Sequence, residues 1–196
     1  MTTFLSMDGV MQGPGGPDED MSGGFDRGGW SVPYSDEDFG RYVTEWFTAA
    51  DAFLLGRKTY EIFAGYWPNH NEPGDPVANK LNDLPKYVAS NTLTSADWHN
   101  TTIINGNLAV EVGKLKSQPG RELQVHGSGV LAQSLMENDL IDEYRLMVFP
   151  VVVGKGKRLF AEGTEAALKL IEAKTTSTGV VVHVYEPAGK PEYGSF

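Results

Sequence analysis

The sequence predicts an α/β fold with a mostly parallel sheet, and three observations support this. Short apolar runs repeatedly give way, at a glycine or a small polar residue, to segments whose apolar residues follow the i, i+4 spacing of a helix. The clearest case is residues 123–138, where the chain turns at Gly127-Ser128-Gly129, after which residues 144–149 alternate as a strand. Such a unit predicts two parallel strands joined by a right-handed helical crossover. Finally, residues 168–174 and 180–185 flank a turn, which predicts an antiparallel hairpin.

Composition narrows the classes of function. The chain has 196 residues, of which 40% are hydrophobic, so one domain spanning residues 1–196 is predicted. It has no cysteine, and its four histidines show no ligand spacing, so we expect neither disulfides nor a metal site. No apolar run approaches the roughly 20 residues of a membrane span, and no signal peptide is recognisable, which predicts a cytoplasmic protein. The formal net charge of −10 argues against nucleic acid or an anionic membrane as a partner.

In chain order, residues 3–6 predict a first strand that ends at the turn Asp8-Gly9. Residues 12–33 are rich in glycine and proline and carry an acidic trio. They predict a long loop, which is either a mobile excursion or a lid over a ligand. Residues 39–47 place aromatic and apolar side chains at helical spacing. The other elements are predicted at 52–55 (strand), 57–63 (helix), 76–84 (helix), 86–89 (strand), 101–105 (strand) and 108–115 (helix).

Four predicted strands end in small or polar residues, namely Gly56, Ser90, Gly106 and Gly127. In a parallel sheet the carboxyl ends of the strands share one edge, and ligands bind there. Arg57 and Lys58 open a helix at this edge, although cations at a helix N-terminus are unfavourable unless an anion is present. The glycines around Ser128 leave helix amides open to an anion such as a pyrophosphate. A phosphate site is therefore predicted. Alternatively, Arg57 and Lys58 are a solvated pair on a helix surface, Gly127 and Gly129 only make a tight turn, and Ser128 only caps the helix.

The following stretches occur in order along almost the whole chain: SMDG at 6–9, LGRKTYE at 55–61, PKYVAS at 85–90, HGSG at 126–129, LIDE at 140–143, and PVVVG at 150–154 before KRLF at 157–160. Their order resembles the dihydrofolate reductase superfamily, and within it the reductase domain of bacterial riboflavin-biosynthesis deaminase/reductase proteins. The resemblance implies a three-layer fold with a mixed, mostly parallel eight-stranded sheet, flanking helices and a C-terminal antiparallel hairpin. It also implies NADPH as cofactor and hydride transfer to a C=N or C=O bond of a heterocycle or a ring-opened sugar.

The resemblance assigns cofactor-binding roles to Gly56, Arg57, Lys58, Thr59, Ser90, Asn91, Gly127, Ser128, Gly129, Val130 and Leu131. Residues 57–59 would lie at the cofactor phosphates, Ser90 near the ribose 2′-phosphate, and residues 127–131 at the pyrophosphate and the adjoining sugar. The nicotinamide would lie between the loop at Asp8-Gly9 and the turn at Gly127.

Little covalent chemistry is expected of the protein. It would align the hydride donor with the acceptor carbon, while water or one carboxyl group supplies the proton. Asp8 and Glu143 are the candidates for that carboxyl group; alternatively, Asp8 is a turn residue and Glu143 a surface acid at a strand end. The aromatic residues that could stack on a flat substrate are Trp30, Phe63, Tyr66 and Trp67, although core packing explains such residues equally well. His126 is predicted to end a strand rather than to act as a base.

The sequence also bears on other functions of the same fold. A true dihydrofolate reductase would place a carboxylate at or near Gly40, and the nearest acids are Asp38 and Glu45, so folate is not the expected substrate. The sequence contains no HxE…PCxxC deaminase pattern, so we expect a stand-alone reductase similar to 5-amino-6-(5-phosphoribosylamino)uracil reductases. The alternative from another class is a nucleotide-binding or sensory protein without turnover. A homodimer is also predicted, in which residues 151–153 and the last hairpin pair across a two-fold axis.

Overall fold

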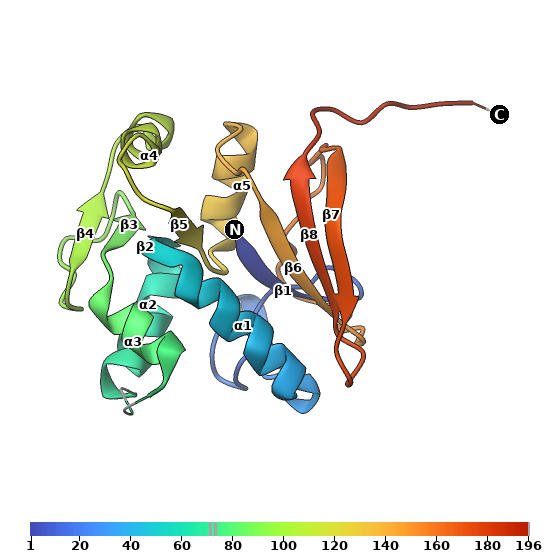
Figure 1. Cartoon of the computed structure of the whole chain (residues 1–196), viewed down its shortest axis with the longest axis horizontal. Helices are drawn as coiled ribbons and strands as arrows, with labels where there is room; N and C mark the ends of the chain where they lie inside the picture. Colours follow the sequence, from blue (N-terminus) through green and yellow to red (C-terminus); the bar gives the residue numbers. More distant parts are fainter. Residues whose placement is uncertain (71, 73, 196) are drawn as a thin grey trace. The chain divides into compact units, whose positions relative to one another are not determined.

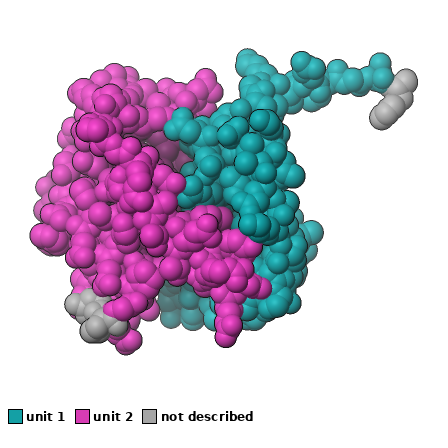
Figure 2. Space-filling view, viewed as in Figure 1, with its two compact units in different colours: residues 1–36, 141–196 teal, residues 37–140 magenta. Residues whose placement is uncertain are grey.

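The computed structural model describes residues 1–70, 72 and 74–195 (Figure 1). The chain forms two compact units, which Figure 2 colours teal and magenta. Unit 1 consists of residues 1–36 and 141–196, and unit 2 of residues 37–140. Each unit contains one four-stranded sheet. The single domain predicted for residues 1–196 stays a prediction.

Unit 2 is an α/β unit whose sheet has the strand order β4-β3-β2-β5, with every neighbouring pair parallel. Its strands are β2 (Ala50–Gly56), β3 (Lys86–Ala89), β4 (Thr101–Ile104) and β5 (Glu122–Val125). Its helices are α1 (Glu37–Ala49), α2 (Arg57–Tyr66), the 3-10 turn η3 (Trp67–Asn69), α3 (Pro76–Asp83), α4 (Leu108–Lys116) and α5 (Gly129–Glu137). Helices α1 to α3 cover one face of the sheet and α4 and α5 the other, which makes three layers (Figure 1). This arrangement confirms the parallel sheet that the strand-glycine-helix passages predicted.

The core of unit 2 lies between β2 and the helices α1 to α3. Because a parallel sheet is covered on both faces, its central strand is apolar on both sides, and Phe53, Leu54 and Leu55 in β2 are each at most 1% exposed. The cluster on the α1 to α3 side contains Phe47, Ala50, Phe53, Leu55, Tyr60, Leu81, Val88 and Trp98. This packing fixes where β2 ends and α2 begins.

Unit 1 holds a mixed sheet with the strand order β1-β6-β8-β7. Its strands are β1 (Thr2–Ser6), β6 (Tyr144–Phe149), β7 (Leu168–Thr175) and β8 (Val181–Pro187), and its 3-10 turns are η1 (Ser22–Gly24) and η2 (Val32–Tyr34). Strand β1 pairs parallel to β6, whereas β8 is antiparallel to both β6 and β7. The β7–β8 pair is the predicted C-terminal hairpin, which is thereby confirmed.

Two topological predictions are wrong. The strands form two sheets of four rather than one sheet of eight. Strands β5 and β6, predicted to be parallel partners across α5, do not pair: β5 pairs with β2, and β6 pairs with β1 and β8. The alternation of apolar residues identifies a strand but not its partner, and β1 supplies the parallel neighbour of β6 from the other end of the chain.

The glycine-rich loop at 12–33 is anchored within unit 1. The indole of Trp30 donates to the carbonyl of Gln12 over 2.8 Å, and its ring meets Phe149 edge-on at 5.5 Å. The ammonium of Lys157 binds the carboxylate of Asp20 at 2.8 Å. These contacts hold the loop in place within unit 1, whereas the sequence predicted either a mobile excursion or a lid.

Gly156 has no room for a side chain against this loop. A Cβ atom there would lie 2.7 Å from Cγ1 of Val10 and 2.9 Å from Cε2 of Phe25, and its φ is +127°. We expect Gly156→Ala to lower the free energy of unfolding by about 2–4 kcal/mol, because overpacking adds to backbone strain. Denaturant unfolding measures this. Gly163→Ala is the control, since Gly163 also has a positive φ but open space around it. Equal losses for the two variants would contradict the overpacking argument.

Among the described residues, no helix has the length and apolar character needed to cross a membrane.

Candidate functional site

The candidate site is the carboxyl edge of the parallel sheet in unit 2. Since β2, β3, β4 and β5 are all parallel, their carboxyl ends lie along the same edge, as predicted. The segments that follow the strands there are residues 56–58, 90–93, 105–107 and 126–129. The helices α2, α4 and α5 begin at this edge, so their amide ends gather there.

The turn into α5 has two consecutive residues in the left-handed region. The φ angles are +54° at Gly127 and +56° at Ser128. Glycine adopts this conformation freely, whereas for a serine it costs of order 1 kcal/mol. The contacts of Ser128 compensate for that cost.

Ser128 is buried and ties the starts of α2 and α5 together. Its Oγ accepts the amide of Gly56 at 3.0 Å and donates to the carbonyl of His126 at 2.9 Å. Its own amide donates to Oγ1 of Thr59 at 3.0 Å. The side chain makes no capping hydrogen bond to α5, so the alternative of a serine cap is wrong. Ser128 and Thr59 therefore hold the two helix starts in place, and the Ser128 hydroxyl is turned inward.

At this junction the first turn of α5 lies at the carboxyl edge of the sheet. By helix geometry the amides of Gly129, Val130 and Leu131 have no acceptor within the helix. The side chain of Val130 is 79% exposed, whereas that of Leu131 is 6% exposed and packs into unit 2. Gly56 lies opposite, where an added Cβ would sit 3.5 Å from Cβ of Leu131. These backbone donors suit an anion.

Arg57 and Lys58 form the first turn of α2, and both are exposed. That turn contains no acidic residue, so the helix dipole is uncompensated there. Nη1 of Arg57 donates to Oγ1 of Thr92 at 3.0 Å, and its Nε lies 3.4 Å from Oε1 of Glu61. Lys58 makes no ion pair with any residue that the structure describes. The structure thus brings both predicted cations to the edge that holds the start of α5.

The loop after β3 contributes polar side chains from 90 to 92. Oγ of Ser90 accepts the amides of Thr92 at 3.2 Å and Leu93 at 2.9 Å. Oδ1 of Asn91 accepts the amide of Gly106 at 3.2 Å, which links this loop to the one after β4. The sequence offers three small hydrogen-bonding side chains here, Ser90, Asn91 and Thr92, but no local pattern signals the contact of Thr92 with Arg57.

Asp8, the first carboxylate candidate, lies in unit 1. Its side chain accepts hydrogen bonds from the Ser6 hydroxyl at 2.7 Å and from the amides of Val153 and Gly154 at 3.0 and 2.8 Å. These bonds, chiefly that from Ser6, lower the pKa of Asp8 to about 2. An ionised acceptor has no proton to give at neutral pH, so the geometry favours a structural role, joining the turn after β1 to the 153–154 segment.

We expect Asp8→Asn to lower the free energy of unfolding by about 1–2 kcal/mol at pH 7, because the amides of Val153 and Gly154 donate to different carboxylate oxygens and asparagine keeps only one acceptor oxygen. The folded-state pKa of Asp8 lies below its unfolded value, so the stabilisation is full above about pH 5 and is lost as the pH falls towards 2. Urea unfolding at pH 7, 5 and 3 should show that the difference in unfolding free energy between wild type and Asp8→Asn shrinks as the pH falls. Asp18→Asn, at an exposed residue, is the control. A difference that does not change with pH would contradict this account.

Glu143, the second candidate, is paired within unit 1. Its carboxylate binds Nε of Arg145, and its backbone carbonyl accepts from the terminal amine of Met1. Its side chain is 39% exposed. The contact with Arg145 gives this carboxylate a structural partner within unit 1.

The predicted stacking residues occupy packed positions. Trp30 is only 8% exposed, within unit 1. Phe63 and Trp67 pack against the core cluster of unit 2 and meet each other edge-on at 6.3 Å. Tyr66 is 50% exposed, and its ring stacks on His70 at 3.7 Å. Packing contacts explain all four rings. His126 directly follows β5 and stacks on Phe47 at 4.2 Å, as expected of a structural residue.

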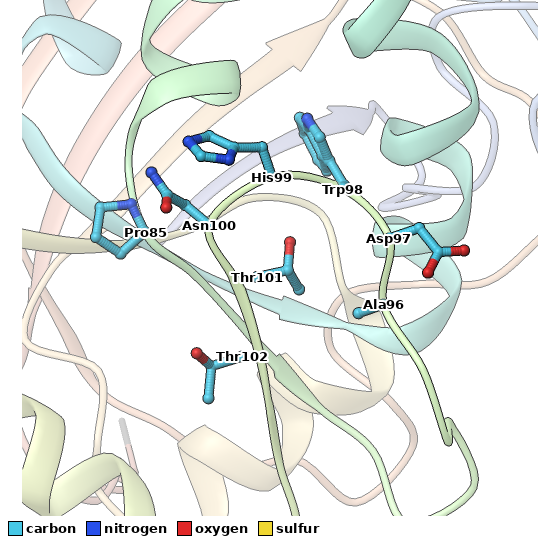
Figure 3. Close-up of a pocket in the computed structure, with 8 residues that line it drawn as sticks. All are labelled: Pro85, Ala96, Asp97, Trp98, His99, Asn100, Thr101 and Thr102. Carbon is cyan, nitrogen blue, oxygen red and sulfur yellow. The ribbon is translucent and has the colours of Figure 1, made fainter.

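A hollow of about 470 Å³ opens at the opposite, amino end of β3 and β4 (Figure 3). It is lined by Pro85, Ala96, Asp97, Trp98, His99, Asn100, Thr101 and Thr102. The lining is polar and the sequence did not predict it. Since it lies at the amino ends of the strands, it is separate from the carboxyl-edge site.

Comparison with known proteins identifies the family. A family model described as the RibD C-terminal domain matches residues 1–183. The Bacillus subtilis (strain 168) protein YyaP is 31% identical over 184 residues, which cover 92% of this chain and 90% of YyaP.

Solved structures share the fold. A putative riboflavin biosynthesis protein from Shewanella sp. PV-4 superimposes with a TM-score of 0.71 at 20% identity, over 95% of this chain and 96% of that one. A diaminohydroxyphosphoribosylaminopyrimidine deaminase/5-amino-6-(5-phosphoribosylamino)uracil reductase from Thermotoga maritima has a TM-score of 0.64 at 12% identity, over 95% of this chain and 55% of its own. The family match and the extent of the YyaP alignment together show that the chain belongs to the RibD C-terminal domain family.

Proposed function

We propose that this chain is an NADPH-dependent reductase that transfers a hydride to a small heterocyclic substrate of the ribosylaminopyrimidine type. The observation that carries the proposal is the junction of α2 and α5, where two helix starts tied through Ser128 lie with two exposed cations, Arg57 and Lys58. Membership of the RibD C-terminal domain family supports reductase chemistry. The reductase named in the Thermotoga maritima neighbour supports the substrate class.

The donor set at the carboxyl edge fits a phosphorylated dinucleotide. We propose that Arg57 and Lys58 bind its phosphates, while the amides of residues 129–131 bind the pyrophosphate. Thr59 and Ser128 would hold the starts of α2 and α5 in fixed positions for this ligand. Every group offered is a cation or a hydrogen-bond donor, which is the chemistry that phosphate oxygens require.

NADPH, when bound, supplies the hydride. The protein orients the two reactants, and we propose that water gives the proton. Asp8 is ionised and its carboxylate already accepts three hydrogen bonds, while Glu143 is engaged by Arg145. The residues that remain for catalysis therefore act by positioning.

Binding and turnover test this proposal separately. Tryptophan fluorescence quenching and calorimetry with NADPH and NADH measure binding, and NADPH should bind more tightly. Consumption of NADPH is then followed with dihydropterins, ribosylaminopyrimidines and small carbonyl compounds, of which the ribosylaminopyrimidines should react fastest. Absence of binding by both dinucleotides would refute the proposal. Tight NADPH binding without turnover on any substrate would instead favour the second candidate, a nucleotide-binding protein that keeps the fold.

We also propose a homodimer formed through unit 1. Strand β7 is the last strand in its sheet, and Leu170 and Ile171 on it are 52% and 48% exposed. Val152, in the segment predicted to pair, is 71% exposed. An edge strand with exposed apolar side chains is a natural template for a second copy. Light scattering at assay concentration tests this, and a monomeric mass would refute it.

A further inference from the structure

We propose that Asn105 is a site of spontaneous modification, at which loss of the side-chain amide places a new carboxylate at the carboxyl edge of the parallel sheet. Asn105 directly follows β4 and is the only asparagine in the sequence that precedes a glycine. Glycine has no side chain to hinder ring closure with the preceding residue and turns its backbone freely, so an Asn-Gly pair reacts more readily than other asparagine pairs.

The reaction requires water alone. The backbone nitrogen of Gly106 attacks Cγ of Asn105, a C–N bond forms, and the side-chain nitrogen leaves as ammonia with the proton that the backbone amide gives up. The product is a cyclic imide. Water then adds to one of the two ring carbonyls and breaks its bond to the ring nitrogen, which takes back a proton. Opening at Cγ gives aspartate, and opening at the main-chain carbonyl gives isoaspartate.

The local structure leaves Asn105 free to react. Residues 105–107 are all exposed. Gly106 has a φ of +92°, and apart from its chain neighbours no described atom lies within 4 Å of a Cβ built on it, so the space beside it is open. Oδ1 of Asn107 is engaged as the cap of α4, where it accepts the amide of Val110 at 3.1 Å. By contrast, the side chain of Asn105 makes no hydrogen bond within the described part of the chain that would hold it away from Gly106.

One contact restrains the reaction. The amide of Gly106, whose nitrogen is the nucleophile, donates to Oδ1 of Asn91 at 3.2 Å. While this hydrogen bond lasts, the nitrogen keeps its proton and the peptide plane before Gly106 is held in place. Asn91 is itself exposed, and hydrogen bonds between exposed loop residues open often. Asn91 therefore slows the modification without preventing it.

The new carboxylate changes the charge of the candidate site. Gly106 is bonded to Asn91, and the next residue, Thr92, accepts from Nη1 of Arg57 at 3.0 Å. The modified residue thus adjoins the loop that contacts this cation. A negative charge added there repels a phosphorylated ligand and attracts the guanidinium. This consequence rests on the proposed function, whereas the modification itself does not.

Peptide mapping by mass spectrometry tests the modification. The full chain is incubated at pH 7 and pH 9, and the converted fraction of every asparagine is followed, together with the isoaspartate formed. We expect conversion at Asn105 to exceed that at all other asparagines and to be faster at pH 9, because hydroxide removes the amide proton. Asn105→Gln, which would have to close a larger ring, should remain unconverted. Wild-type protein that keeps its Asn105 amide throughout would overturn the proposal.

The restraint is tested by the same measurement on variants of Asn91. Asn91→Ala should convert about fivefold faster than wild type, as for the loss of one hydrogen bond, and Asn91→Asp, which keeps an acceptor oxygen, should stay near wild type. Asn107→Ala is the control, because it removes the cap of α4 beside the site and leaves the bond between Asn91 and Gly106. An equal acceleration in this control would overturn the role of Asn91.

Calorimetry with NADPH tests the consequence. Asn105→Asp carries the new charge in every molecule and should bind NADPH about twofold to fivefold more weakly than wild type, as for one added charge at an exposed site. The neutral Asn105→Gln should resemble wild type. Equal affinities of all three would overturn the effect on the site but leave the modification. If wild type binds no NADPH, the proposed function fails, and the mass-spectrometric result still decides whether Asn105 is modified.

Discussion

A variant in which Arg57 and Lys58 are both replaced by glutamine will bind NADPH about a hundredfold more weakly than wild type. Each charge-assisted hydrogen bond to a phosphate is worth about 1.5–3 kcal/mol, so the loss of two corresponds to about two to four decades in the dissociation constant, and the donors that glutamine keeps place the effect at the lower end. The glutamines keep the length of the side chains and some donors but remove both positive charges. Calorimetric titration with NADPH at constant ionic strength measures the effect.

Unfolding is not an explanation for that loss, because the same substitutions remove cations from a helix N-terminus. Removing the cations relieves their unfavourable interaction with the dipole of α2, and this gain offsets the loss of the exposed Arg57–Glu61 ion pair. The free energy of unfolding should therefore change by less than about 0.5 kcal/mol. The control is the double variant Arg41→Gln and Lys114→Gln, which removes two exposed cations of unit 2 away from the starts of α2 and α5. A similar loss of affinity in the control would show that only the overall charge matters, contrary to a local site.

The second large effect is on stability. Lys86→Met will lower the free energy of unfolding by about 2–3 kcal/mol. Lys86 is 0% exposed, and its ammonium donates to the carbonyls of Leu81, Asn82 and Leu84 at 2.7, 3.2 and 2.9 Å. It also lies 4.5 Å from the centre of the Trp98 ring. Methionine would fill the space but leave three carbonyls at the end of α3 without their donor, at about 1 kcal/mol each.

Burial lowers the pKa of Lys86 to about 8, so the amine is protonated at neutral pH and the comparison belongs at pH 7. Urea unfolding measures the change. The matched control is Lys80→Met, on α3, whose ammonium reaches a single carbonyl, that of Ala50, at 3.1 Å. We expect the control to lose less than about 1 kcal/mol. An unchanged or increased stability of Lys86→Met would mean that the cost of burying the ammonium exceeds what its hydrogen bonds contribute.

The sequence was sufficient for features that depend on neighbours along the chain. The turn at Gly127 to Gly129 and the passage from Gly56 into α2 follow from glycine chemistry and helical spacing, and both occur where predicted. The shared carboxyl edge followed from the parallel sheet. The partner of β6 did not, because the pairing of strands depends on packing across the whole chain and not on the pattern within one strand.

The contacts of single side chains could not be predicted from the sequence, because they also depend on packing across the whole chain. Ser128 was expected to face the ligand, yet its left-handed backbone turns the hydroxyl towards Gly56. The hydrogen bond between Thr92 and Arg57 was not predicted, because Arg57 lies on another element. Lys86 begins a strand, where a lysine is ordinarily at the surface, and only the carbonyls at the end of α3 explain its burial.

The discontinuity of unit 1 has a consequence for biosynthesis. Unit 2 is a single continuous stretch, so all of its strands have left the ribosome before β6 is made. Strand β1 is made before unit 2, but its parallel partner β6 follows only after the whole of unit 2 has been translated. During that interval the residues of β1, of which Phe4 and Leu5 are aromatic or apolar, lack their hydrogen-bonding neighbour. Nascent chains halted before Phe149 should therefore be the ones that require chaperones.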